Sequence, residues 1–253
     1  MTGSLTIVGL GPGSAALMAP AAAQALAAAT DLVGYGPYLD RVPATAEQRR
    51  HASDNRVELQ RAREALTLAA SGHRVAVVSG GDPGIFAMAA AVLEAVEAGD
   101  PAWRALAIDV VPGISAMQAA SAQVGALLGH DFCAISLSDN LKPRDVIARR
   151  LSAALQADFV IALYNPISKA RPDGLGAALD LARGVQAATT PVVFARAVSR
   201  ADETIRITTL AEAEATMADM QTVVIIGSSQ TRLVAKAGGG AWVLTPRSYE
   251  AAS

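Results

Sequence analysis

Residues 74–84 read RVAVVSGGDPG, an apolar run that breaks at once into glycine, aspartate and proline. Four of the first six residues are apolar without alternation, which is typical of a strand buried on both faces of a parallel sheet. An alanine-rich helical stretch, residues 86–98, follows the turn. Strand, tight turn and helix in this order predict one βα unit of an α/β protein.

The same order repeats on either side of this unit. Further strands are expected at 5–10, 31–35 and 108–111, and further helices at 20–29, 44–70 and 114–128. The long segment 44–70 is predicted to be one helix because Leu59, Ala62, Leu66 and Ala69 recur at spacings of three and four. This alternation predicts a parallel sheet in the N-terminal part of the chain.

The pattern changes beyond residue 128. Strands are expected at 132–137, 159–164, 191–196, 204–209 and 222–227, with helices at 144–156, 174–187 and 210–218. Segments 191–196 and 204–209 look like a hairpin, which indicates a mixed sheet, and the residues after about 235 are expected to form a loose tail. The sequence therefore predicts two α/β domains, residues 1–113 and 114–253.

Composition excludes several classes of protein. Of the 253 residues, 52% are hydrophobic and 17% charged, which excludes a disordered, highly charged chain. The 21 basic residues are balanced by 23 acidic ones, so nothing indicates a nucleic-acid partner. The single cysteine, Cys133, forbids a disulfide framework or a thiolate zinc cluster. His51, His73 and His130 lie far apart in sequence, so we expect no metal site and histidines that are exposed or partly buried.

The N-terminal residues MTGSLTIVGLGPGS lack a basic region and run directly into a strand pattern, so no signal peptide is expected. Segment 15–29 is too short and too weakly apolar to span a bilayer. We therefore expect a cytoplasmic protein without a membrane partner.

Three glycine-rich turns each follow a predicted strand: GLGPGS (9–14), SGGDPG (79–84) and VPGIS (111–115). Ligands of open α/β sheets bind outside the carboxyl ends of the strands, and glycine lets the backbone approach a ligand closely. The turns could also serve packing alone. The first turn fails as a dinucleotide fingerprint because its third glycine comes one position early, and the chain has no G-x-x-x-x-G-K-[ST] phosphate loop.

Several side chains near these strand ends could carry chemistry. Asp82 could stabilise its own turn by accepting backbone N–H groups, or it could accept a ligand hydroxyl or amino group. Asn165 would present its amide at the end of the buried run LYNP. Lys169 and Arg171 could be a solvated charge pair or cations facing an acidic ligand.

Two of the four tyrosines, Tyr35 and Tyr38, flank the dipeptide Gly36-Pro37. We expect them in a loop, where their rings would offer a contact surface for a flat ligand rather than pack in the core.

Taken in order, the motifs GLGPGS, YGPY (35–38), SGGDPGIF (79–86), VVPGISA (110–116) and LYNP (163–166) resemble the tetrapyrrole (corrin) methylases of cobalamin biosynthesis. The resemblance covers about residues 4–232. It implies two α/β domains with the active site in the cleft between them, a homodimer, and methyl transfer from S-adenosyl-L-methionine to a tetrapyrrole. Segments 31–40, 135–139 and 160–169 are similar to the branch that methylates C-17 and contracts the macrocycle.

The resemblance also implies roles for individual residues. On the cofactor side it places Gly81, Asp82, Pro83, Ile85, Phe86, Ser115, Ala116, Tyr164, Asn165, Arg196, Ala197, Gly227 and Ser228. The macrocycle of this family carries many carboxylates, so basic residues in nearby loops are also expected to bind it. The macrocycle side is expected to comprise Gly11, Pro12, Gly13, Ser14, Tyr35, Tyr38, Arg41, Lys169 and Arg171.

Methyl transfer is an in-line displacement, for which alignment of donor and acceptor supplies most of the acceleration. Ring contraction requires a proton acceptor, and Asp82, Asp139 and Asn165 are the candidate catalytic residues. Three alternatives stay open: the anaerobic branch, which uses a cobalt-containing substrate; another methylase of the family, including the diphthamide enzyme; and a non-enzymatic α/β ligand-binding module. The single cysteine argues against variants with an iron–sulfur extension.

Overall fold

The structure is a computed structural model that describes residues 3–168 and 172–249. The chain divides into two compact units, Met1–Ser115 and Ala116–Ser253. The boundary expected from the sequence, after residue 113, lies two residues earlier. Within the described ranges, every helix is too short or too polar to span a membrane.

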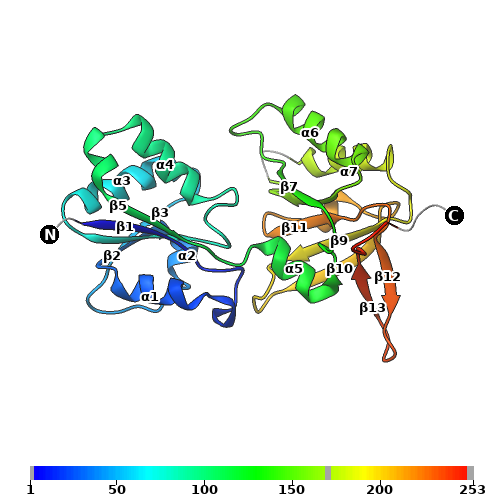
Figure 1. Ribbon diagram of the computed structural model, residues 1–253, viewed down its shortest axis with the longest axis horizontal. Helices are drawn as coiled ribbons and strands as arrows, with labels where there is room; N and C mark the ends of the chain where they lie inside the picture. The colour runs from blue at the N-terminus through cyan, green and yellow to red at the C-terminus, as the bar shows by residue number, and fades with distance from the viewer. Residues whose placement is uncertain (1–2, 169–171, 250–253) are drawn as a thin grey trace. The chain divides into compact units, whose positions relative to one another are not determined.

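The N-terminal unit is built on a parallel sheet with the strand order β3-β2-β4-β1-β5 (Figure 1). Its strands are β1 (Ser4–Gly9), β2 (Asp31–Tyr35), β3 (Arg49–Ser53), β4 (Arg74–Ser79) and β5 (Ala107–Val111). Its helices are α1 (Pro20–Ala28), α2 (Gly36–Leu39), α3 (Glu58–Ala70) and α4 (Met88–Ala98), with short 3-10 turns η1 (Ala15–Leu17) and η2 (Pro101–Ala105). All strands run in one direction, so their carboxyl ends share one edge.

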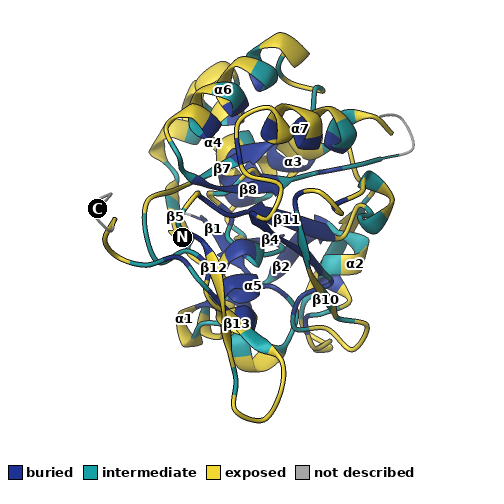
Figure 2. Ribbon diagram, turned by 90° about the vertical axis from the view of Figure 1, so that its right-hand side faces the viewer, coloured by how far each residue is buried: buried dark blue, intermediate teal, exposed yellow. Residues whose placement is uncertain are grey.

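Helices cover both faces of this sheet (Figure 1). Leu5 and Ile7 of β1 pack with α3 and α4, whereas Val8 of the same strand packs with α1. Successive side chains of a strand point to opposite faces, so a strand that is buried on both faces is apolar throughout. The central strands are accordingly buried along nearly their whole length (Figure 2).

The prediction of one helix over 44–70 is wrong in its first half. Residues Arg49–Ser53 form β3 at the sheet edge, and the helix α3 begins only at Glu58. The segment RRHAS has no apolar pattern because its side chains serve polar contacts: Arg50 donates to Leu39 O (2.9 Å) and Val42 O (2.7 Å). A polar edge strand carries no periodicity that a hydrophobic pattern could detect.

The C-terminal unit contains a mixed sheet with the order β10-β9-β11-β8-β7. Its strands are β7 (Phe132–Ser136), β8 (Val160–Tyr164), β9 (Pro191–Arg196), β10 (Thr204–Thr209) and β11 (Thr222–Ile226). Strands β7 and β8 are parallel, β11 is antiparallel to β8 and β9, and β9 and β10 form the expected antiparallel pair. Helices α6 (Arg144–Gln156) and α7 (Gly174–Arg183) pack on one face, and α5 (Ala116–Val124) contacts β11. The predicted fold class, a parallel N-terminal and a mixed C-terminal sheet, is confirmed.

The predicted helix 114–128 is shorter in the structure. It begins at Ala116 and ends at Val124, because Gly125 (φ +131°) starts the short strand β6 (Gly125–Ala126). The predicted helix 210–218 shrinks to the turn η3 (Ala215–Met217). There the amides of Leu210 and Ala211 donate to Thr190 O and Ala188 O of a neighbouring loop instead of helical carbonyls.

The loose tail expected after residue 235 is also wrong as far as residue 244. Strands β12 (Arg232–Ala235) and β13 (Ala241–Leu244) form a hairpin (Figure 1). Strand β13 also pairs with β6. The Lys236 ammonium lies 5.2 Å from the ring centre of Trp242. The buried Thr245 hydroxyl donates to Leu127 O (2.6 Å), which fixes the chain beyond the hairpin.

Candidate functional site

The first two glycine-rich turns meet at the carboxyl edge of the N-terminal sheet. Strands β1 and β4 are parallel neighbours that end at Gly9 and Ser79, which pair in register. Beyond these ends, Gly11 N donates to Gly81 O (3.2 Å) and Gly81 N donates to Gly11 O (3.0 Å). This reciprocal pair joins the first two turns through backbone atoms.

The third turn joins the same junction through Gly113. Its N–H donates to Asp82 Oδ2 (3.0 Å). A Cβ atom at Gly113 would lie 2.2 Å from Gly81 O and close to two further backbone atoms, Gly9 C (3.0 Å) and Gly11 N (3.1 Å). Glycine is therefore required here, because the backbones of the three turns pack directly on one another.

Asp82 uses both carboxylate oxygens inside the turns. Oδ1 accepts from Gly84 N (2.8 Å) and Oδ2 accepts from Gly113 N (3.0 Å). These two contacts agree with the interpretation that Asp82 stabilises its own turn. An ionised carboxylate offers about four acceptor positions, so hydroxyl or amino donors of a ligand can still bind the same group.

The second turn leaves the sheet through a strained residue. Phe86 has φ +53°, which is not a helical conformation, so the helix begins at Met88 rather than at residue 86. The Phe86 side chain is half-exposed. Hydrogen bonds from Ile85 N to Asp82 O (3.3 Å) and from Ala89 N to Pro83 O (2.9 Å) enclose Phe86. A bulky side chain with positive φ persists only where its surroundings enforce it, and such residues cluster at ligand sites.

The tyrosines lie in regular structure, so their expected place in a loop is wrong. Tyr35 ends β2 and Tyr38 belongs to the short helix α2, and their rings meet edge to face at 5.4 Å. The Tyr38 ring lies against Gly80, where a Cβ would come within 2.7 Å of Tyr38 Cζ. Tyr38 therefore contacts the second turn directly.

Arg41 contacts the first turn. Its Nη2 lies within hydrogen-bond distance of the carbonyls of Leu10 (3.2 Å), Gly11 (3.0 Å) and Gly13 (3.4 Å). Pro12 is buried between them, and Ser14 Oγ accepts from Ala16 N (3.2 Å) to begin η1. The guanidinium thus stabilises the turn that was expected to contact the macrocycle.

In the C-terminal unit, Tyr164 ends β8 and Asn165 follows it. Asn165 has φ +53°, and its Nδ2 donates to Ser136 Oγ (2.9 Å) at the end of the parallel strand β7. The Tyr164 hydroxyl accepts from Met117 N (3.2 Å) and so contacts the start of α5 beside Ala116. Ser136 was missed from the sequence, although it ends a strand beside a predicted site strand.

Arg196 ends β9 and Ala197 follows it, and β9 runs parallel to β8 because both are antiparallel to β11. They therefore lie at the same edge as Asn165. Arg196 donates through Nε to Asp219 Oδ2 (2.7 Å) and through Nη1 to Asp202 Oδ2 (2.9 Å), and these hydrogen bonds raise its pKa. Ala197 has φ +47° and donates its N–H to Gln221 O (3.0 Å).

Gly227 and Ser228 lie at the other edge of this sheet, and their expected role on the cofactor side stays a prediction. They follow the end of β11, whose last residue Ile226 pairs with Ile161 and Val192 near the starts of β8 and β9. Because β11 is antiparallel, its end lies at the opposite edge of the sheet. The ends of all strands lie at one edge only in a sheet whose strands are all parallel.

The predicted positions that remain are Asp139, Ser115, Lys169 and Arg171. Asp139 lies in the loop after β7, where Oδ2 accepts from Arg144 Nε (2.7 Å). Ser115 is buried and lies beside the second turn, because a Cβ atom at Gly81 would be 3.9 Å from Ser115 Cα. Lys169 and Arg171 fall outside the described residues.

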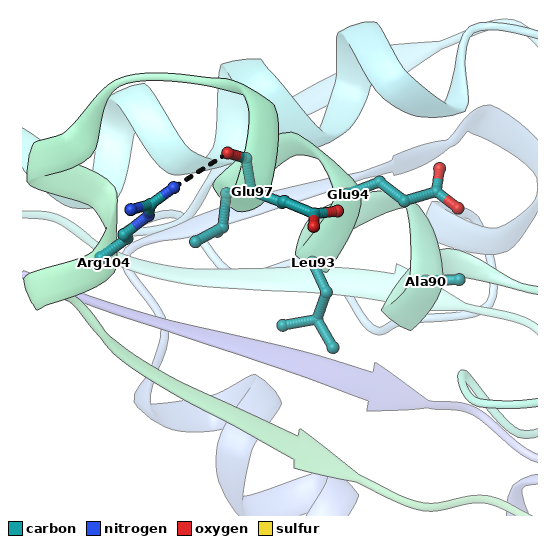
Figure 3. A pocket seen from close by; sticks show the side chains of 6 residues that line it. Ala90, Leu93, Glu94, Glu97 and Arg104 are labelled. Carbon is teal, nitrogen blue, oxygen red and sulfur yellow. Dashed lines mark hydrogen bonds between the residues drawn. The ribbon is translucent and has the colours of Figure 1, made fainter.

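A shallow hollow on α4 and η2 lies apart from these turns and contains none of the predicted site residues (Figure 3). It is lined by Ala90, Leu93, Glu94, Val96, Glu97 and Arg104. Its one drawn hydrogen bond runs from Arg104 Nη2 to Glu97 O (3.1 Å). Because none of the predicted site residues lines this hollow, we place the candidate site at the strand ends. Over the described part of the chain, no three His, Cys, Asp or Glu side chains are grouped to hold a metal ion.

The family model of the Tetrapyrrole (Corrin/Porphyrin) Methylases matches residues 4–214, and the chain belongs to this family. Its members are methyltransferases that use S-adenosyl-L-methionine, as the motifs implied. The chain is 58% identical over 253 residues to a precorrin-3B C(17)-methyltransferase of a Sinorhizobium species, covering 100% of both chains.

Two further comparisons extend this similarity. A probable cobalt-factor III C(17)-methyltransferase of Salmonella typhimurium is 40% identical over 246 residues, which cover 97% of this chain and 99% of the relative. The crystal structure of the methyltransferase CobJ superposes with a TM-score of 0.92 at 49% identity, over 96% of this chain and 100% of the other.

Proposed function

We propose that the chain transfers a methyl group from S-adenosyl-L-methionine to C-17 of precorrin-3B, with contraction of the macrocycle to give precorrin-4. The observation that carries this proposal is the 58% identity, along the full length of both chains, to a relative of that name. The candidate residues agree with the chemistry, because a displacement at a sulfonium carbon needs shape and placed backbone groups more than a nucleophile.

The second candidate substrate is cobalt-factor III, supported by the 40% identity to the probable cobalt-factor III enzyme of Salmonella. The higher identity to the precorrin-3B enzyme favours the metal-free substrate. Incubation with each macrocycle separately, with methyl-labelled cofactor, distinguishes the two. We expect label in the product from precorrin-3B at the higher kcat/KM.

For the cofactor we propose two groups of residues. In the N-terminal unit these are Gly81, Asp82, Pro83, Ile85, Phe86 and Ser115, and in the C-terminal unit Ala116, Tyr164, Asn165, Arg196 and Ala197. The donor set fits the group: Asp82 retains acceptor positions for hydroxyl or amino donors, and the exposed Phe86 ring offers an apolar face. When bound, the cofactor supplies an electrophilic methyl group on its sulfonium.

For the macrocycle we propose Gly11, Pro12, Gly13 and Ser14 of the first turn together with Tyr35, Tyr38 and Arg41. Arg41 supplies positive charge for a substrate rich in carboxylates. Its contacts to Leu10 O and Gly11 O keep that charge beside the first turn. Lys169 and Arg171 are proposed for the same role on sequence grounds alone.

Ring contraction needs a group that accepts the proton of a substrate hydroxyl. Asn165 has a neutral amide and so can orient a substrate but cannot serve as the base at neutral pH. Asp82 is proposed above for the cofactor, so we propose Asp139 as the base for the macrocycle, oriented by Arg144. Asp139→Asn should then impair contraction more than cofactor binding.

The decisive experiment is incubation of the purified protein with precorrin-3B and labelled S-adenosyl-L-methionine, with product analysis by mass spectrometry and absorbance. A product without one extra methyl group would overturn the proposal. Titration calorimetry with the cofactor alone separates an enzyme of this family from a binding module without the site. A homodimer in the cytoplasm remains our prediction, and light scattering measures the oligomeric state.

A further inference from the structure

Arg61 is a charged side chain in the interior of the N-terminal unit. It lies on α3 and is only 4% exposed. Its three nitrogens reach three different partners: Nε donates to Ser53 Oγ (2.8 Å), Nη2 to Asp54 O (2.6 Å) and Nη1 to Met88 Sδ (3.3 Å). A thioether is a weak acceptor, so the contact to Met88 holds a position more than it neutralises a charge.

No carboxylate within the described ranges forms an ion pair with Arg61. Burial lowers the pKa of the guanidinium, and Glu58, Tyr38 and Glu64 oppose that shift only through space. Burying a cation without a directly paired anion is unfavourable, and an apolar residue of similar size would often fold equally well. The charge therefore points to a role other than filling the core.

The partners of Arg61 show what it connects. Ser53 ends β3 at the carboxyl edge that also carries the glycine-rich turns, and Asp54 follows it. Met88 begins α4 two residues after the strained Phe86, and its side chain is buried. The Arg61 guanidinium thus links the end of β3 to Met88, the residue that begins α4 after the second turn.

We propose that Arg61 is a positioning residue of the second turn: by holding Met88 against Ser53 and Asp54, it keeps Phe86 in the left-handed conformation that presents its ring to the ligand. Within the turn, Ile85 N donates to Asp82 O and Ala89 N donates to Pro83 O, on either side of Phe86. From outside the turn, Arg61 holds the side chain of Met88, which lies between Phe86 and Ala89. The ligand named in this proposal, S-adenosyl-L-methionine, rests on the proposed function.

The conformational part of the proposal can be tested without any ligand. Phe86 is 51% exposed and Trp242, on the separate β12–β13 hairpin, is 48% exposed, so chymotrypsin can sample both. Arg61→Met keeps the volume and removes the hydrogen bonds. We expect it to raise the cleavage rate after Phe86 by about fivefold or more, with cleavage after Trp242 unchanged, because only the turn opens locally.

Arg63 on the same helix is exposed and provides the matched control. Arg63→Met should leave both cleavage rates unchanged, and Arg61→Lys should restore part of the protection. Cleavage after Phe86 that stays at the wild-type rate in R61M, or that rises equally after Trp242, would overturn the proposal. If R61M does not fold, R61K decides by the same comparison of the two sites.

The functional part is tested by a double-mutant cycle with Phe86→Gly, which removes the strained side chain. We expect R61M to weaken cofactor binding about tenfold in the wild-type background but within about twofold in the F86G background. A general structural role would give equal losses in both backgrounds and would contradict the proposal. If the unaltered protein does not bind the cofactor, the proposed function fails, while the proteolysis still decides the role of Arg61.

Discussion

The Asp82 carboxylate accepts a hydrogen bond from the backbone N–H of Gly113, 31 residues further along the chain, at 3.0 Å. Together with its bond from Gly84 N, this contact makes Asp82 the link between the second and third turns. A carboxylate that binds two backbone N–H groups contributes to stability as well as to any ligand site.

We therefore expect Asp82→Ala to lower the free energy of unfolding by about 2–4 kcal/mol, since two N–H groups lose a charged acceptor. Asp82→Asn retains one oxygen and should lose about half as much. Urea unfolding measures both, and calorimetry gives the accompanying loss of cofactor affinity. Wild-type stability in D82A would show that the N–H bonds do not hold the turns together.

Gly113→Ala should be more damaging than its size suggests. The added methyl group would lie 2.2 Å from Gly81 O, so the turns must separate. We expect a loss of about 3 kcal/mol or more, within the range of strong overpacking. Gly176→Ala in α7 is the matched control, because nothing lies within 4 Å of the new Cβ and alanine favours a helix. Equal melting temperatures of G113A and G176A would contradict the close packing of the turns.

Most elements of the fold could be predicted because their apolar residues follow a clear pattern. The buried strand Arg74–Ser79 and its turn were found from RVAVVSGGDPG alone. The strand Arg49–Ser53 could not be found, because at a sheet edge its side chains bind Asp31 and backbone carbonyls instead of entering the core. The segment Gly125–Ala126 became a strand only because β13, over a hundred residues later, pairs with it.

The residues of the candidate site could be predicted from the sequence only where the direction of the strands before them could be predicted. Parallel strands carry Gly11, Gly81 and Gly113 to one edge, and glycine-rich turns are visible in a sequence. The direction of β11 depends on its pairing partners, so the sequence alone does not say at which edge of the sheet Gly227 and Ser228 lie. Arg61 was not singled out because a lone arginine in a helical pattern usually lies on the exposed face.

Asp31 forms a second polar cluster, at the start of β2 and so at the edge opposite the turns. Its side chain is fully buried, and it contacts His51 Nε2 (2.9 Å), Arg49 Nε (3.0 Å), His73 Nδ1 (3.1 Å) and Thr30 Oγ1 (2.7 Å). Burial raises the pKa of Asp31, but the hydrogen bonds from His51, Thr30 and Arg49 outweigh it and lower the pKa from 3.8 to about 2.

This lowered pKa predicts an acid-dependent loss of stability. The charged form is favoured in the folded state, so the contribution is complete above pH 3.8 and is lost as the pH falls from there towards 2. Its size is about 2 kcal/mol, because one pKa unit corresponds to about 1.4 kcal/mol. Urea unfolding between pH 2 and 6 should show a smaller slope for Asp31→Asn than for the wild type. Asp109→Asn, at an exposed position of β5, should leave the slope unchanged.

Two variants of Asn165 should separate its effect on stability from its effect on methyl transfer. Its backbone has φ +53° and its amide donates to Ser136 Oγ. Glycine adopts this conformation freely, whereas alanine does not, so Asn165→Gly should be more stable than Asn165→Ala by about 1 kcal/mol. Both variants lack the amide, and we expect both to lose methyl transfer by about tenfold or more despite their different stabilities. Unfolding in urea and turnover with labelled cofactor measure the two effects independently. If N165G turns over at the wild-type rate, the amide has no part in the reaction and Asn165 serves only the turn after β8.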